Sequence, residues 1–167
     1  MLVNRYSKKI FNLAYQFAGS YPAAEDLTQD IFLKLHHNLS KYNPKKSFDG
    51  WILTLARNYL IDHYRKHKLE KEKRKEFREF NLSSGSGFDP ESRLQRSEAQ
   101  KEVWSGLKFL SPEVRMVVIL RDLQGKKYEE IAETMELPLG TVKSRVNRGR
   151  LQLAEHLKKN REEKNDM

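Results

Sequence analysis

Four polar side chains near the C-terminal end of the chain have the types and the spacing that read DNA bases. Lys143, Ser144, Asn147 and Arg148 recur at intervals of one, three and four residues, so they share one face of a helix. Arg and Lys pair with guanine edges, Asn pairs with adenine, and Ser bonds a base or a phosphate. The pattern predicts a base-reading face. The alternative is a basic, solvated face in an ordinary helical bundle.

Two short helices would have to position this face. Ile131, Ala132 and Met135 have the spacing of one buried helix face, and a second buried stripe follows at Val142, Val146, Gly149 and Leu153. The segment from Glu136 to Gly140 separates the two helices, because Pro138 removes a backbone donor and Gly140 relaxes the chain. Glycine is common where Glu136 stands, so a left-handed Glu136 would cost on the order of 1 kcal/mol. The run predicts a helix-turn-helix that enters the major groove.

The composition agrees with a polyanionic partner. Lys and Arg outnumber Asp and Glu by 32 to 23, for a net charge of +9, and they cluster in residues 57–75 and 143–150. The absence of Cys excludes disulfides and thiolate metal sites. The N-terminus lacks the apolar core of a signal peptide, and no apolar run approaches membrane-spanning length. We therefore expect a cytoplasmic protein without membrane insertion.

The N-terminal half predicts three helices. The first runs from about Asn4 to Ala18 and is closed by Gly19, and the second runs from Ala23 to about Leu39 with Leu27, Ile31 and Leu35 buried. The outer face of the second helix combines acidic side chains with an outward leucine, at Asp26, Gln29, Asp30 and Leu33. This face suits a protein partner, and equally a solvated acidic helix start stabilised by the helix dipole.

The third helix follows a loop at residues 41–46 and begins near Phe48, with Ser47 as its cap. Aromatic residues interleaved with Arg57, Arg65, Lys66 and Lys68 fit single-stranded nucleic acid, where bases stack on rings and cations follow phosphates. Simple core packing is the favoured alternative for Phe48 and Trp51.

The Ser- and Gly-rich stretch from Asn81 to Glu91 predicts a flexible linker and divides the chain. Beyond it we expect a helix from about Arg93 to Phe109, then a restart at Ser111, which offers a capping hydroxyl, and Pro112. Val114, Val117, Val118 and Leu120 would be core, and Gly125 would end that helix. The fold class is therefore all-α, with two small helical domains.

Taken together, these stretches resemble a bacterial RNA polymerase sigma factor of the sigma-70 family, of the extracytoplasmic-function (group IV) type. The N-terminal resemblance is carried by AEDLTQDIFLKL and FDGWILTLARNYLIDHYRK, and the C-terminal one by LSPEVRMVVILRDLQGKKYEEIAETMELPLGTVKSRVNRGRLQL. It implies region 2 in residues 1–80, a flexible linker in 81–92, region 4 in 93–160 and a charged tail in 161–167.

The resemblance also implies roles for individual residues. The face of Asp26, Gln29, Asp30 and Leu33 matches the surface that docks on the β′ clamp helices of core RNA polymerase. Region 4 would contact the β flap. Residues that match the minus-ten reader are Asn43, Lys45, Lys46, Phe48, Asn58, Asp62 and Arg65. Lys143, Ser144, Asn147 and Arg148 match the minus-thirty-five reader, and Thr141, Arg145 and Arg150 match phosphate or structural contacts. An anti-sigma factor is a further implied partner, and no cofactor is implied.

Two other classes of function compete with this interpretation. A conventional helix-turn-helix regulator would bind promoter DNA as a dimer without polymerase, using the acidic face as its interface. An enzyme is the third reading. His63 and His67 have the spacing of a metal-binding pair, but no glutamate sits between them in the manner of a zincin and no third ligand is nearby. Solvated or phosphate-facing histidines are the favoured alternative, and no catalytic residue is predicted.

Overall fold

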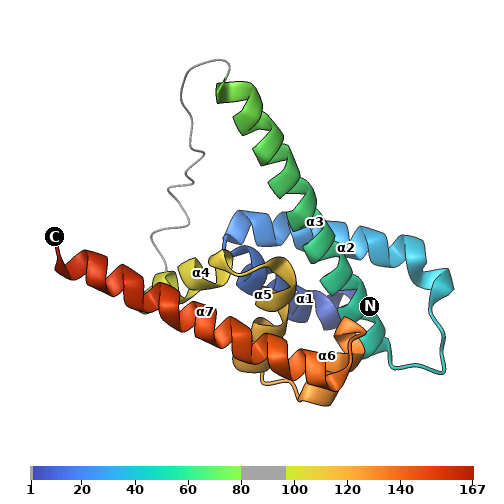
Figure 1. Ribbon diagram of the computed structural model, residues 1–167. Helices are drawn as coiled ribbons and strands as arrows, with labels where there is room; N and C mark the ends of the chain where they lie inside the picture. The colour runs from blue at the N-terminus through green and yellow to red at the C-terminus, as the bar shows by residue number, and fades with distance from the viewer. Residues whose placement is uncertain (1, 80–96) are drawn as a thin grey trace.

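The computed structural model describes residues 2–79 and 97–167, and in these ranges the regular structure is entirely helical (Figure 1). This confirms the all-α prediction. The predicted linker at 81–92 lies outside the described residues. The helices are α1 (Leu2–Ala18), α2 (Tyr21–Asn38), η1 (Leu39–Lys41), α3 (Phe48–Glu79), α4 (Glu98–Phe109), α5 (Pro112–Val118), η3 (Ile119–Leu123), α6 (Tyr128–Met135) and α7 (Leu139–Asn165).

The first three long helices, α1 to α3, pack together as the N-terminal bundle. Each contributes one apolar stripe at helical spacing, as predicted, and the stripes meet in a shared core. The buried residues include Ile10, Leu13, Ala14, Phe17, Leu27, Ile31, Leu35, Ile52, Ala56 and Leu60. The second half of α3 rises away from the other helices in Figure 1, and its side chains from Arg65 to Leu69 are exposed.

Turn chemistry fixes where these helices begin and end. Gly19 takes a φ of 72° between α1 and α2, a conformation that costs glycine little. The hydroxyl of Ser20 accepts from the Ala23 N–H at 3.5 Å, and Pro22 occupies the first turn of α2. Ser47 caps α3 as predicted, because its Oγ accepts from the Gly50 N–H at 3.3 Å.

The remaining helices, α4 to α7, form the C-terminal bundle, in which the start of α4 and the capping of α5 differ from the prediction. α4 begins at Glu98 rather than near Arg93, since Ser97 and Gln100 form a reciprocal capping box. Ser111 precedes α5 but its hydroxyl caps nothing, so the predicted side-chain cap there is wrong. Pro112 starts that helix as expected, and it is buried.

The predicted core of this bundle is confirmed at Val114, Val117, Val118 and Leu120, all of which are buried. After Val118 the helix widens into the π-helical turn η3. The chain leaves that turn through Gly125, whose φ is 67°, and the Lys126 N–H returns to the Leu120 carbonyl at 2.9 Å. Gly125 therefore ends the helix as predicted.

The two bundles touch through several pairs of helices. α3 packs against α5 and α6, and α1 packs against α4. In Figure 1 the first half of α3 runs down to lie beside α6. None of the helices in the described ranges is long and apolar enough to cross a membrane.

Candidate nucleic-acid and polymerase interfaces

The turn between α6 and α7 is as tight as the sequence predicts. Glu136 is left-handed, with φ 54° and ψ 45°, and the Leu137 N–H returns to the Ala132 carbonyl at 3.0 Å. Pro138 is the N-cap of α7, which begins at Leu139. Gly140 therefore lies inside the first turn of α7, and its predicted role as part of the break is wrong. The break needs only the left-handed residue and the proline.

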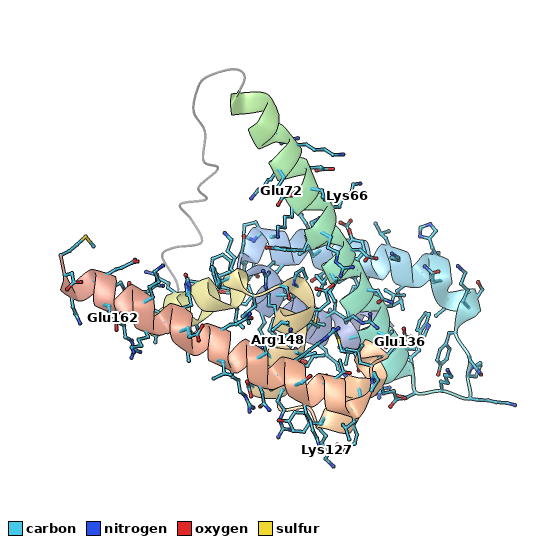
Figure 2. All side chains as sticks on the ribbon, in the orientation of Figure 1. Lys66, Glu72, Lys127, Glu136, Arg148 and Glu162 are labelled. Atoms are coloured by element: carbon cyan, nitrogen blue, oxygen red, sulfur yellow. The ribbon has the colours of Figure 1, made fainter. Side chains whose placement is uncertain are left out.

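α7 buries one face and exposes the other. Val142, Val146 and Gly149 are buried, and Gly149 lies against Val114 and Val118 of α5. The predicted base-reading residues Lys143, Ser144, Asn147 and Arg148 are all exposed, and Figure 2 labels Arg148 on the first half of α7. Close packing at Gly149 thus sets the direction in which the polar face points.

The predicted phosphate or structural contacts on α7 divide into two kinds. Thr141 and Arg145 are half-buried, and the Thr141 carbonyl accepts from the Ser144 hydroxyl at 3.0 Å. Arg150 instead makes a two-pronged ion pair with Asp122 of η3, with Nε and Oδ2 2.9 Å apart. Its hydrogen bond to Asp122 raises the pKa of Arg150 above its ordinary value. Arg150 therefore ties α7 to η3, which favours the structural role.

The loop before α3 presents Asn43, Lys45 and Lys46 to solvent in a defined shape. The Asn43 side-chain oxygen accepts from the Lys45 N–H at 3.0 Å, and the Tyr42 hydroxyl donates to the Lys46 carbonyl at 2.6 Å. Phe48 is half-buried, at 5.2–5.6 Å between ring centroids from Tyr6, Tyr42 and Trp51. These ring contacts form an aromatic cluster that packs behind the loop and restrains it.

Asn58, Asp62 and Arg65 are exposed on α3, the helix that begins at Phe48 directly after this loop. Arg65 forms an ion pair with Glu113 of α5. Arg57, expected among the cations that follow phosphates, points instead into the contact between the bundles and donates to the Thr134 carbonyl at 2.8 Å. Burial lowers the pKa of Arg57.

Sequence reasoning missed Arg115, whose side chain is 2% exposed between the two bundles. Burial lowers the pKa of this guanidinium, yet hydrogen bonds surround it. One signal could have identified it. Arg115 is the single cation in the otherwise apolar run from Val114 to Leu120. Because its neighbours are expected to be buried, this arginine is expected to be buried as well.

The acidic face of α2 is exposed at Asp26, Gln29, Asp30 and Leu33, and Leu33 leaves 59% of its surface to solvent. Asp30 is the best-anchored member, because its Oδ2 accepts from the Tyr59 hydroxyl at 2.8 Å. Burial and this hydrogen bond raise the pKa of Tyr59 to about 12. The face thus combines an exposed apolar side chain with carboxylates, one of them held in place by α3.

His63 and His67 face each other on α3, with their Nε2 atoms 3.0 Å apart. Burial, and then the neighbouring His67, lower the pKa of His63. The described residues hold no group of three or more side chains suited to a metal ion. The pair makes an imidazole hydrogen bond, with His67 exposed and His63 half-buried.

Comparison with known proteins identifies the family. The model of sigma-70 region 2 matches residues 2–70, and the model of sigma-70 region 4 matches residues 102–153. The chain belongs to the ECF sigma factors of the sigma-70 family. This is a family of sigma factors rather than enzymes, and the chain is a sigma factor that serves promoter recognition by RNA polymerase.

Curated relatives support the assignment over most of the chain. The sigma factor is 33% identical to ECF sigma factor SigE of Mycolicibacterium smegmatis over 97% of its own length, but it spans only 62% of that relative. It is 30% identical to RNA polymerase sigma factor YlaC of Bacillus subtilis, covering 97% of this chain and 93% of YlaC. It is 31% identical to the ECF sigma-E factor of Escherichia coli K12, over 90% of this chain and 81% of that protein.

Two solved structures resemble the fold across both bundles. One is the sigma factor RpoE in complex with the anti-sigma factor NepR from Bartonella quintana, at TM-score 0.67 and 25% identity, over 93% of this chain and 94% of that one. The other is CnrH in complex with the cytosolic domain of CnrY, at TM-score 0.66 and 25% identity, over 94% and 85% of the two chains.

Proposed function

We propose that this sigma factor docks on core RNA polymerase through α2 and reads the promoter with both bundles. The minus-ten element is read as opened single strand by the N-terminal bundle, and the minus-thirty-five element as duplex by the C-terminal bundle. The observation that carries the proposal is that the two bundles expose faces of different chemistry. A polar, basic face is exposed on α7, and an acidic face with an outward leucine is exposed on α2.

The duplex is read by α7. Lys143, Ser144, Asn147 and Arg148 are exposed side by side, and their donors and acceptors match base edges in the major groove. Thr141 and Arg145 lie at the margin of this face, where they position the helix on phosphates. Phosphate contacts make the affinity fall steeply as salt rises.

The opened strand is read by the loop before α3 and by α3 itself. Asn43, Lys45 and Lys46 supply hydrogen bonds and charge at the loop, and the wall of Phe48 backs it. Asn58, Asp62 and Arg65 continue the surface along α3. Holding a base out of the stack costs a few kcal/mol. The N-terminal bundle alone cannot offset this free-energy cost for several bases, so contacts with polymerase must supply the rest.

Polymerase docks on the face of Asp26, Gln29, Asp30 and Leu33, with the β′ clamp helices as its partner, and the C-terminal bundle contacts the β flap. The mixture of an exposed leucine with surrounding carboxylates supports a protein partner that supplies basic and apolar groups. An anti-sigma factor is a further proposed partner. It is supported by the likeness to a sigma factor that was solved bound to the anti-sigma factor NepR.

Binding of a fluorescent forked promoter fragment, with duplex upstream and an unpaired non-template strand downstream, tests these roles. We expect tight binding only when core polymerase is present. Leu33→Lys should weaken core binding at least tenfold. Leu69→Lys on α3 is the matched control, because Leu33 and Leu69 are exposed to a similar extent, 59% and 57%.

Equal loss for the two leucine variants would refute the docking face. Binding that does not depend on core polymerase would refute the proposed mechanism as a whole. If the protein binds the duplex part as a dimer and core polymerase adds nothing, the protein is a polymerase-independent helix-turn-helix regulator.

A further inference from the structure

Asp30 belongs to the proposed docking face of α2, and a tyrosine of the neighbouring helix α3 holds its carboxylate in place. The Tyr59 hydroxyl donates to Oδ2 of Asp30 at 2.8 Å. A hydrogen bond to a charged acceptor is about twice as strong as one between neutral groups, so this bond fixes the direction in which an exposed carboxylate points. Burial and the bond to Asp30 raise the pKa of Tyr59 to about 12, which keeps the hydroxyl protonated and donating at neutral pH.

A cation of the same helix competes for this carboxylate. Lys34 follows Asp30 by four residues, and an acid four residues before a base is the spacing that favours an ion pair within a helix. The two side chains, both of which the structure describes, do not form that pair. The ammonium of Lys34 lies instead over the ring of Tyr59, 5.4 Å from the ring centroid. Lys34 therefore does not neutralise Asp30.

The Tyr59 ring is itself restrained within α3. The side chain is half-buried, and the ring of His63 stacks on it, with the two centroids 5.9 Å apart and an interplanar angle of 28°. The ring therefore offers Lys34 a fixed cation–π partner. Tyr59 acts on two residues of α2 through two parts of its side chain, because the hydroxyl binds Asp30 and the ring holds Lys34.

Both contacts favour the docking of a cationic partner on α2. Asp30 is exposed, and a carboxylate that is already oriented loses little side-chain entropy when a partner's cation binds it. The Tyr59 hydroxyl occupies Oδ2 and leaves Oδ1 to the partner. An ion pair with Lys34 would have the opposite effect, because the partner's cation would first have to displace the ammonium.

We propose that Tyr59 is a positioning residue for polymerase docking, whose hydroxyl orients the Asp30 carboxylate and whose ring keeps Lys34 from neutralising it. This inference rests on the proposed function, in which Asp30 contacts the polymerase. It adds to the docking machinery a residue of α3 that is not one of the four residues of the docking face. Tyr59 acts through Asp30, so its effect on docking must depend on Asp30.

Binding of the labelled protein to core RNA polymerase, without DNA, tests the role of the hydroxyl. Tyr59→Phe removes the hydroxyl and keeps the ring, and it should weaken core binding about threefold to tenfold. Tyr128→Phe is the matched control, because it removes a hydroxyl that bonds charged Arg150 of the C-terminal bundle. The control should bind core within about twofold of the wild type. Unchanged binding by Tyr59→Phe would overturn the proposal.

The same substitution in an Asp30→Ala background separates positioning from support of the fold. Asp30→Ala removes the carboxylate through which Tyr59 acts, so adding Tyr59→Phe should change core binding by less than about twofold. A further loss as large as that in the wild-type background would mean that Tyr59 contacts polymerase itself or only supports the bundle. Either result would overturn the positioning role.

A larger substitution tests the role of the ring. Tyr59→Leu removes both contacts and frees Lys34 to pair with Asp30, so it should weaken core binding more than Tyr59→Phe does. Adding Lys34→Met to Tyr59→Leu should recover at least threefold of the lost affinity. In the wild-type background Lys34→Met should give no such gain, because the ring already holds the ammonium away. An equal gain in both backgrounds would show that the ring does not control Lys34.

NMR of the free protein tests the ring contact independently of polymerase. The side-chain methylene protons of Lys34 should be shifted upfield by the ring in the wild type and in Tyr59→Phe, and this shift should disappear in Tyr59→Leu. Identical shifts in all three proteins would refute the contact. If the wild type does not bind core polymerase, the proposed function fails, whereas a wild type that binds core alongside a Tyr59→Phe variant that binds equally well overturns only the role of Tyr59.

Discussion

Gly149 is the position at which packing sets the direction of the proposed DNA-reading face. A Cβ built there would lie 2.5 Å from Val118 Cγ2 and 2.8 Å from Val114 Cγ1, whereas ordinary contacts begin at 3.4 Å. The valines would have to move by 0.9 and 0.6 Å, the differences between these distances. Both are β-branched residues in the core, so they have few other rotamers to adopt. Gly149→Ala should therefore overpack the contact between α5 and α7.

The expected cost follows from two opposing effects. Overpacking a core costs about 1–3 kcal/mol, and replacing a helical glycine with alanine returns about 0.5–1 kcal/mol. We expect a net loss of up to about 2.5 kcal/mol, which lowers the Tm by up to roughly 10 °C for a chain of this size. Gly140→Ala on the same helix has nothing within 4 Å of its Cβ, so it should gain up to about 1 kcal/mol.

Thermal and urea unfolding followed by circular dichroism would measure both variants. Gly149→Ala should also weaken binding to the duplex part of the promoter, because α7 must shift on α5. If Gly149→Ala is as stable as Gly140→Ala, the close packing of α7 on α5 is wrong.

Three further predictions concern the turn, the base-reading face and the histidine pair. Glu136→Gly should stabilise the protein by about 1 kcal/mol in urea unfolding, because glycine adopts the left-handed conformation without the side-chain penalty. The ion pair with Arg57 that is lost contributes little, since the Glu136 side chain is exposed. A loss of stability would contradict this. Asn147→Ala should relax specificity at one base pair, while Arg145→Ala should weaken binding to all sequences evenly, in titrations of matched and mismatched promoters; equal losses for both variants would exclude the assignment. In NMR titration, His63 should protonate below the ordinary imidazole pKa of about 6.5, and His67→Ala should move its pKa upward, because His67 contributes to the depression. The lowered pKa means that the unfolded chain binds this proton more readily, so the contribution of His63 to stability is present above about pH 6.5 and is lost as the pH falls through the folded-state pKa. An unchanged His63 titration in His67→Ala would contradict the coupling.

Helical periodicity was enough to predict most of the fold. The buried stripes of α1, α2, α3, α6 and α7 follow the three- and four-residue spacing of apolar side chains, because each helix buries one face. The left-handed Glu136 was also accessible from the sequence, since a helix that ends just before a proline needs a tight reversal. The polar faces of α2 and α7 are exposed for the same reason that the opposite faces are buried.

The contact between the bundles could not be predicted in this way. Arg57 looked like a phosphate-binding cation because its neighbours are basic, and only the placement of α6 against α3 shows that it binds a backbone carbonyl. Arg115 interrupts an apolar run, but its partners come from α1, α3 and α4 and are brought together by tertiary packing. The start of α4 was misplaced because Ser97 competes with earlier residues as a cap, and local sequence does not decide between them.

Run-off transcription with bacterial core RNA polymerase tests the central claim most directly. The template would be a library with randomised promoter elements and spacers, transcribed with and without the protein. The account predicts transcripts that depend on the protein and share two sequence elements at a fixed spacing, with Asn147→Ala changing only the upstream element. Transcription that is identical with and without the protein, together with duplex binding by a dimer in the absence of polymerase, would contradict it.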